Sequence, residues 1–161
     1  MAIPITQVLS HWQHSFKDLN MSSHEFYLKV ETELNGQQLP VTKIARAGHR
    51  ERGIFSAARE YLRVQNGNLV FDICAAPFGT NFFVSWWLYH SESSLRSFVK
   101  STRIGAYISK LSHRQTFFEI DSETMFKECV HQALMETLDR ITQEKGFKLS
   151  DTDKQIKNVA A

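Results

Sequence analysis

The sequence has few cysteines, prolines and glycines, and it has no long apolar run. Its 161 residues include 2 Cys, 3 Pro and 7 Gly, which excludes disulfide-rich, collagen-like and low-complexity proteins. The longest strongly apolar run, Phe82 to Tyr89, is far shorter than the ~20 residues that a helix needs to cross a bilayer. With 42% hydrophobic and 22% charged residues, the chain instead has the composition of a protein with one packed core.

The two ends of the chain and its cysteines indicate a cytoplasmic protein. Met1 to Ser10 contains neither Lys nor Arg and no apolar stretch of the secretory type. Cys74 and Cys129 lie far apart, each within an apolar pattern, so we expect two free thiols rather than a disulfide. The polar composition after residue 149 predicts a single domain over 1–149 and a flexible tail over 150–161.

The first 47 residues predict a helix followed by a hairpin. Apolar residues at steps of three or four predict a helix over 4–19, with Pro4 in its first turn. Residues 26–34 read as a strand ending at Asn35-Gly36, a pair that suits a tight turn, and residues 41–47 would form the return strand. Pro40 lacks an N–H, so this return strand lies at a sheet edge or begins after the proline.

A second Asn-Gly pair, at 66–67, predicts a hairpin between residues 60–65 and 68–75. Its expected register puts one set of pairs in the core and leaves Asp72 diagonal to both Arg59 and Arg63 on the other face. The core pairs are Val64 with Leu69, Leu62 with Phe71 and Glu60 with Ile73, and the others are Arg63 with Val70, Tyr61 with Asp72 and Arg59 with Cys74. The pattern therefore predicts a charge cluster of Arg59, Tyr61, Arg63 and Asp72 on a sheet surface.

The rest of the chain predicts a central strand and a long helix. Residues 81–89 are apolar on both alternations, which is typical of a strand covered on both faces. A short strand over 116–120 precedes a helix capped by Asp121 or Ser122 and stopped by Gly146. The predicted fold class is α+β, with a single, mostly antiparallel sheet of about five strands packed by an N-terminal and a long C-terminal helix.

Positive charge is concentrated in two segments. The net charge is +2, but residues 41–64 carry six basic and two acidic groups, and residues 95–115 carry five basic and no acidic groups. If folding brings them together, they form a face that attracts anions. Glycines at 48 and 53 also allow close backbone approach to a phosphate, although the loop lacks the P-loop motif. The predicted anion-binding residues are Arg46, His49, Arg50, Arg52, Lys100, Arg103 and Arg114.

Three functions remain open on these observations. The leading hypothesis is a non-catalytic module that binds nucleic acid, a nucleotide or an acidic protein surface. A small hydrolase or nuclease with His49 or His131 as its base is an alternative, and so is an adaptor or homo-oligomeric subunit, because 12% of the residues are aromatic. His11, His14 and Asp18 share one arc of the predicted first helix, but no metal-binding or cofactor-binding motif accompanies them, so we expect neither a metal nor a cofactor.

Four sequence blocks resemble an uncharacterised bacterial protein family. They are SAAREYLRV at 56–64, LVFDICAAPFG at 69–79, FFVSWWL at 82–88 and FFEIDSETMF at 117–126. The similarity extends over roughly residues 50–135, and it implies no reaction, cofactor or catalytic residue. Some similar proteins carry a membrane-type segment between the last two blocks, where this chain has the basic stretch 95–115. Peripheral contact with anionic lipid therefore remains open.

Overall fold

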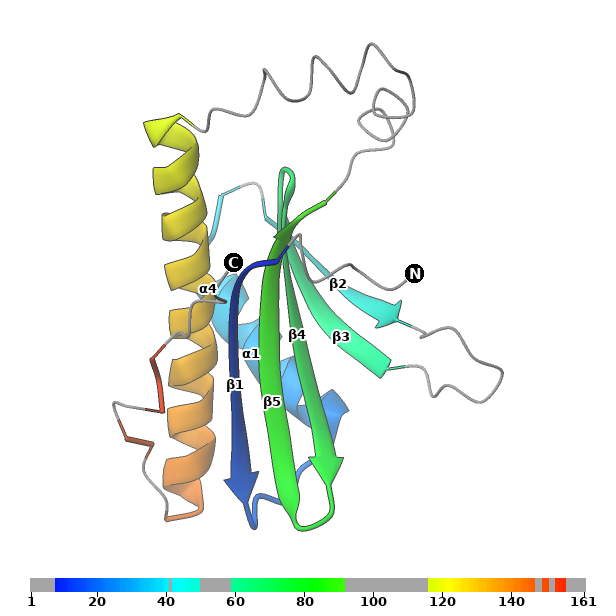
Figure 1. Cartoon of the computed structure of the whole chain (residues 1–161). Helices are drawn as coiled ribbons and strands as arrows, with labels where there is room; N and C mark the ends of the chain where they lie inside the picture. Colours follow the sequence, from blue (N-terminus) through cyan, green and yellow to red (C-terminus); the bar gives the residue numbers. More distant parts are fainter. Residues whose placement is uncertain are drawn as a thin grey trace.

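A computed structural model describes residues 8–40, 42–49, 59–91, 116–146, 149–150 and 153–155. Within them the chain forms one antiparallel sheet and two helices, as shown in Figure 1, and this confirms the predicted α+β class. The elements are β1 (Val8–Lys17), α1 (Ser23–Gly36), β2 (Thr42–His49), β3 (Arg59–Asn66), β4 (Leu69–Phe78), β5 (Asn81–His90) and α4 (Phe117–Glu144).

The sheet has the strand order β1-β5-β4-β3-β2, and each neighbouring pair is antiparallel. β5 lies between β1 and β4, which confirms its predicted interior position. β1 and β2 form the two edges, and β2 begins after Pro40, as expected for a residue that cannot donate to a ladder. Both helices lie on one side of the sheet. Aromatic contacts join them to it, from Phe26 to Phe82 and from Phe126 to Phe71.

The predicted helix over 4–19 is wrong in its described part, because residues 8–17 form strand β1. Trp12 pairs with Trp86 and Phe16 with Phe82, in register with β5. Two residues four positions apart lie on the same side of a helix and also on the same side of a strand. Trp12 and Phe16 satisfy both patterns, and pairing with β5 selects the strand.

The predicted strand over 26–34 is also wrong, because Ser23–Gly36 is helix α1. The Ser22 hydroxyl accepts a hydrogen bond from the Glu25 N–H at 3.1 Å, which caps the helix. Phe26, Val30 and Leu34 then form its buried side, again at steps of four. Residues 35–36 therefore end a helix instead of turning a hairpin, and β2 pairs with β3.

The β3–β4 hairpin forms, but its register is displaced by two residues from the predicted one. The turn residues are Gly67 and Asn68 in place of Asn66 and Gly67, and Gly67 takes the left-handed φ of +57° that glycine tolerates. Leu62 therefore pairs with Ile73. A shift of two leaves each side chain on its predicted face, so the core and surface assignments hold although the pairs change.

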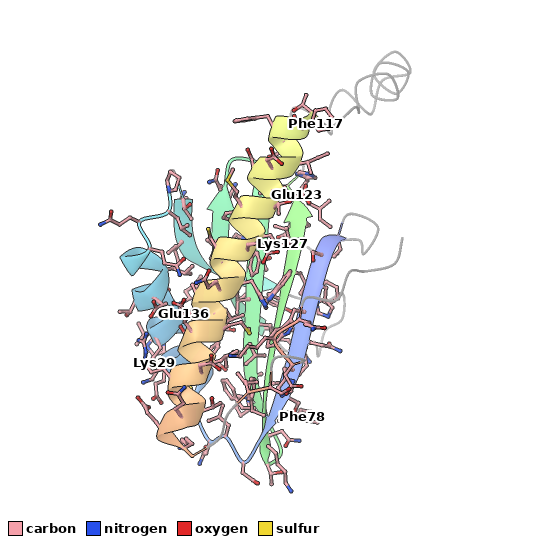
Figure 2. All side chains as sticks on the ribbon, turned by 90° about the vertical axis from the view of Figure 1, so that its left-hand side faces the viewer. Lys29, Phe78, Phe117, Glu123, Lys127 and Glu136 are labelled. Carbon is pink, nitrogen blue, oxygen red and sulfur yellow. The ribbon has the colours of Figure 1, made fainter. Side chains whose placement is uncertain are left out.

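Helix α4 begins earlier than predicted and absorbs the expected strand over 116–120. Thr116 and Glu119 form a capping box: the Thr116 hydroxyl accepts from the Glu119 N–H at 3.2 Å, and the Glu119 carboxylate accepts from the Thr116 N–H at 2.9 Å. This pair replaces the predicted caps, Asp121 and Ser122. Gly146 ends the helix at a φ of +78°, as predicted. Figure 2 shows α4 running along the sheet, with Phe117 at one end of the molecule and Phe78 at the other.

Residues 153–154 contact both β1 and α4. The Trp12 indole N–H donates to the Asp153 carbonyl at 2.8 Å, and His131 Nε2 donates to the Lys154 carbonyl at 2.7 Å. The Lys154 ammonium group reaches the Asp139 carboxylate at 2.6 Å. This part of the predicted tail is thus attached to the domain, and residues 156–161 lie outside the described residues. In the described part of the chain, no helix is long and apolar enough to span a membrane.

Candidate anion-binding face of the sheet

The sheet has one face covered by the helices and a second face that no helix of the described residues covers. Alternation along each strand and the strand register place one set of side chains on this second face. The set consists of His11, Gln13, Ser15 and Lys17 of β1, Asn81, Phe83, Ser85, Trp87 and Tyr89 of β5, Val70, Asp72, Cys74, Ala76 and Phe78 of β4, Arg59, Tyr61, Arg63 and Gln65 of β3, and Lys43, Ala45 and Ala47 of β2. We call it the second face.

A buried carboxylate lies at the centre of the second face. Asp72 is 2% exposed, and Arg63 directly opposite donates to its two oxygens, from Nε at 2.7 Å and from Nη2 at 2.8 Å. The Tyr89 hydroxyl donates to the same carboxylate at 2.7 Å. Burial, and then the Asp72 charge, raise the pKa of Tyr89, so the hydroxyl keeps its proton. Of the predicted cluster, Arg63 and Asp72 form this ion pair, directly opposite each other instead of diagonal, and Tyr89 joins them from β5.

Cys74 also lies on this face, next to Ser85 across the strands. It is buried and free, as the sequence predicts, and Cys129 is free and half-buried. Burial raises the pKa of the Cys74 thiol above its usual value. Burial is also the main cause of the raised pKa of Tyr61, and a hydrogen bond with Cys74 raises it further. Because the thiolate is the reactive form, Cys74 is a poor nucleophile in this setting.

Basic side chains outnumber acidic ones on the second face. Lys17, Lys43 and Arg59 are exposed, and none of them forms an ion pair with another described residue. Asp72 is the only carboxylate among the residues that define the face, and Arg63 already binds it. Three of the four cations belong to the basic segment 41–64. The second face therefore carries a positive charge that its own side chains do not neutralise.

The predicted anion-binding residues are distributed differently from the expectation. Arg46 lies on the helix-covered face, where its guanidinium is 3.1 Å from the Glu31 carboxylate and 4.6 Å from the centre of the Tyr27 ring. His49 is described in its backbone alone, which pairs with Arg59. The remaining five lie outside the described residues: Arg50, Arg52, Lys100, Arg103 and Arg114.

The register also shows where the two basic segments connect to the strands. Segment 41–64 includes β2 and most of β3, which end and begin at the paired residues His49 and Arg59. The other follows β5, whose last residue, His90, pairs with Leu69 beside the β3–β4 turn. These junctions lie at opposite ends of the strands. The second face extends between them.

No protein-family model, curated protein or solved structure matches the chain. The strand register places Lys17, Lys43, Phe83 and Trp87 on the second face, in addition to the residues expected from the sequence. For Lys17 the sequence pattern was the alternation of polar and apolar residues over 11–17, which we interpreted as a helix. For Phe83 and Trp87 it was the second side of the strand over 81–89, which we expected to be covered.

His11 packs against β5, and the predicted arc of His11, His14 and Asp18 does not form. His11 stacks on Trp87 with ring centroids 3.6 Å apart, and its Nδ1 is 2.7 Å from the Trp86 carbonyl. His11 and His14 point to opposite sides of β1, so the arc expected from a helix is lost. No group of three possible metal ligands occurs among the described residues.

His131 is poorly placed to act as a catalytic base. It is buried, and both of its ring nitrogens are engaged: Nδ1 accepts from the Trp86 indole at 3.1 Å, and Nε2 donates to the Lys154 carbonyl at 2.7 Å. Burial also lowers the pKa of the imidazole. A base must reach the proton that it removes, and both ring nitrogens of His131 are already bonded to groups of the protein itself. His131 instead joins α4 to β5 and to the segment around Lys154.

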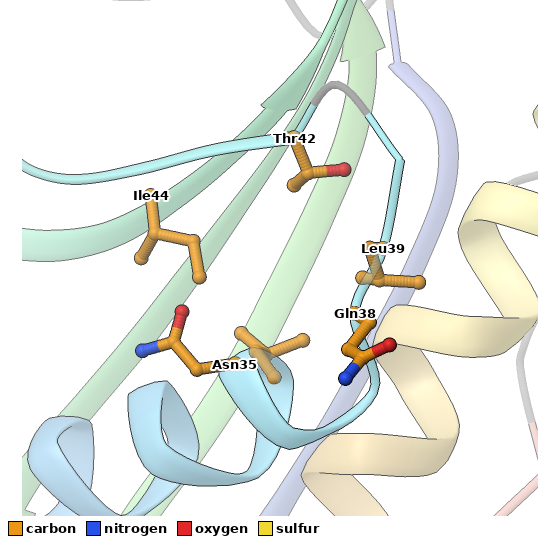
Figure 3. Close-up of a pocket in the computed structure, with 6 residues that line it drawn as sticks. Asn35, Gln38, Leu39, Thr42 and Ile44 are labelled. Atoms are coloured by element: carbon orange, nitrogen blue, oxygen red, sulfur yellow. The ribbon is translucent and has the colours of Figure 1, made fainter.

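A shallow pocket lies between the C-terminal end of α1 and β2, as Figure 3 shows. Its empty volume is about 290 Å³, and its lining offers two amides, one hydroxyl and apolar groups: Leu34, Asn35, Gln38, Leu39, Thr42 and Ile44. It has no charged, nucleophilic or titratable side chain. The pocket therefore supports neither catalysis nor anion binding.

An apolar patch lies elsewhere, at the start of α4. Phe117 is 89% exposed and Phe118 is 79% exposed, and Ile120 and Met125 follow on the next turns. Large apolar side chains grouped on a surface are typical of protein contacts. The patch is the feature that favours the alternative of an adaptor or oligomeric subunit.

Proposed function

We propose that this protein is a non-catalytic module that binds an anionic partner on the second face of its sheet. One observation carries the proposal: Lys17, Lys43 and Arg59 are exposed there, and the single carboxylate, Asp72, is already bound by Arg63. A surface of one sign attracts ligands of the other sign and speeds their association. Three of the four cations on this face, Lys43, Arg59 and Arg63, belong to the basic segment 41–64.

The chemistry of the described residues supports binding over catalysis. The buried thiol of Cys74 has a raised pKa, and both ring nitrogens of His131 are engaged. Both groups therefore lack the activation or access that a nucleophile or a base requires. The cations of the second face, in contrast, need only be exposed to bind phosphate, sulfate or carboxylate groups.

The test compares two variants with the same change in net charge. Lys17→Gln, Lys43→Gln and Arg59→Gln together remove three cations from the second face. Lys29→Gln, Lys127→Gln and Lys145→Gln together remove three cations from the helices on the opposite side. Binding to fluorescent heparin, to a 20-nucleotide single strand and to a 20-base-pair duplex is measured by anisotropy at several salt concentrations.

We expect the wild type to bind at least one of these polyanions at low salt, with log K falling linearly as log salt rises. The second-face variant should lose about two units of that slope on the single strand, since each phosphate contact contributes about 0.7. The helix-side variant should bind like the wild type. Absence of binding to all three polyanions at low salt, or equal losses in the two variants, would overturn the proposal.

A further inference from the structure

We infer that the ligand of the second face is a single-stranded nucleic acid whose bases stack on the aromatic side chains of β4 and β5. This inference rests on the proposed function and names its ligand class. It depends on a second property of the face besides its positive charge, which is the presence of aromatic side chains. Besides cations, the face presents the exposed ring of Phe78 and the half-buried ring of Phe83, whereas the ring of Trp87 is stacked on His11.

These aromatic side chains lie where a single-stranded nucleic acid could run along the sheet. Phe83 and Trp87 lie on the same side of β5, four residues apart, which corresponds to about 13 Å along a strand. Phe78 lies at the end of β4, opposite Asn81, and is 80% exposed. Phe78 and Phe83 thus lie close to each other on the neighbouring interior strands β4 and β5, and Trp87 with its stacked His11 lies further along β5.

Small side chains flank Phe83 on both neighbouring strands. Its partner on β1 is Ser15, which is exposed. Ala76 is the partner of Phe83 on β4. A flat ring can therefore approach Phe83 from the side without meeting a bulky neighbour on the adjacent strand.

The cations border these rings. Lys17 lies at the end of β1 and is the partner of Asn81, close to Phe78. Arg59 and Lys43 lie on β3 and β2, on the opposite side of the rings. The arrangement offers the rings of Phe78 and Phe83 near one end of the face, with positive charge on both sides of them. A strand with its bases turned toward the sheet and its phosphates turned outward meets both.

This combination selects a single strand over other anions. Open sheets that bind RNA use aromatic side chains to stack unpaired bases, while cations hold the backbone. A duplex keeps its bases stacked and paired inside, so it presents mainly phosphates to a flat sheet and gains nothing from Phe78 or Phe83. An acidic protein surface would likewise use the cations and leave the rings unoccupied.

The experiment measures the affinity of the full chain for a fluorescein-labelled 20-nucleotide oligothymidylate and for a duplex of the same length. Phe78→Ala and Phe83→Ala are each compared with Phe118→Ala, which removes an equally large side chain that is 79% exposed on α4. Because Phe83 is half-buried and its variant can lose stability, each variant is first checked by urea unfolding. Phe78→Ala, at an exposed position, provides the reading that does not depend on folding.

We expect the oligothymidylate to bind at least tenfold more tightly than the duplex, and Phe78→Ala and Phe83→Ala each to weaken it by about tenfold, the usual effect of removing one stacking ring. Phe118→Ala should leave it unchanged. Equal binding of single strand and duplex, or an unchanged affinity in Phe78→Ala, would overturn the inference. Heparin binding that persists in that case leaves the proposed function standing, whereas loss of all polyanion binding refutes both.

Discussion

Arg63 and Asp72 make unequal contributions to stability, although they form one ion pair. The Asp72 side chain is 3% exposed and the Arg63 side chain is 29% exposed. Replacing Arg63 by Met leaves a buried carboxylate that has lost two hydrogen bonds from the guanidinium and keeps the one from the Tyr89 hydroxyl. Removing one partner of a buried pair costs about 3–5 kcal/mol, and the remaining hydrogen bond from Tyr89 places the expected cost near ~3 kcal/mol.

Replacing Asp72 by Asn is expected to cost less, about 1–2 kcal/mol. The Arg63 guanidinium can then turn toward water, because its side chain is already partly exposed. The double variant Arg63→Met, Asp72→Leu removes both charges and should recover most of the loss, since an apolar pair of similar volume often replaces a buried ion pair without penalty. In a chain of this length, ~3 kcal/mol corresponds to a decrease in Tm of about 6–12 °C.

Urea unfolding monitored by circular dichroism gives the free energies, and Arg59→Met is the matched control. Arg59 lies on the same strand and face as Arg63 but is exposed and has no ion pair with a described residue, so its loss should change stability by no more than ~0.5 kcal/mol. If Asp72→Asn destabilises the protein as much as Arg63→Met does, the argument from unequal burial is wrong.

Two further predictions concern α4. Burial lowers the pKa of His131 below 6.5 in the folded protein. Just below pH 6.5 the unfolded chain therefore binds more protons than the folded protein does. The stability that His131 contributes is complete above that pH and is lost as the pH falls toward the lowered pKa. His131→Gln should flatten this decrease in urea unfolding between pH 7 and 5, whereas His24→Gln, at an exposed position, should not. Replacing Phe117 and Phe118 together by Ser should change the free energy of unfolding by no more than ~0.5 kcal/mol, because both rings are exposed. The same variant should reduce any concentration-dependent increase in mass that light scattering detects. Unchanged association would exclude this patch as the contact.

The sequence predicted the central part of the fold better than its first third. The second Asn-Gly pair and the alternation around it correctly indicated the β3–β4 hairpin, and the apolar run over 81–89 indicated an interior strand. Register was displaced because the tight turn uses Gly67-Asn68, one residue later than assumed. Since the displacement was by two residues, the residues assigned to the core remained in it.

In the first third of the chain, the predicted helix is a strand and the predicted strand is a helix, because periodicity alone does not distinguish the two there. Trp12 and Phe16 in β1, and Phe26 and Val30 in α1, are each separated by four residues, a spacing that fits one side of a strand and one side of a helix. The cap at Ser22 was the local signal for the helix. The strand state of β1 is decided by its pairing with β5, a partner about seventy residues away in the register.

The same limit explains what was predictable in the candidate site. The Arg63–Asp72 pair arises within one hairpin, so short-range reasoning found both residues, but it missed Tyr89, which joins them from β5. Lys17 comes to lie beside Asn81, and His11 beside Trp87, only after β1 pairs with β5, which no local pattern indicates. The five predicted cations at Arg50, Arg52, Lys100, Arg103 and Arg114 stay a prediction.

The hydrogen bond from Trp12 to Asp153 links positions 141 residues apart in the chain. During synthesis the indole of Trp12 emerges early, and β5 can pair with β1 long before the carbonyl that the indole needs has been made. A contact of such sequence separation forms late, because a long loop must close before it contributes. A chain truncated before residue 153 would contain every strand of the described sheet but would lack the carbonyl group that the indole of Trp12 binds.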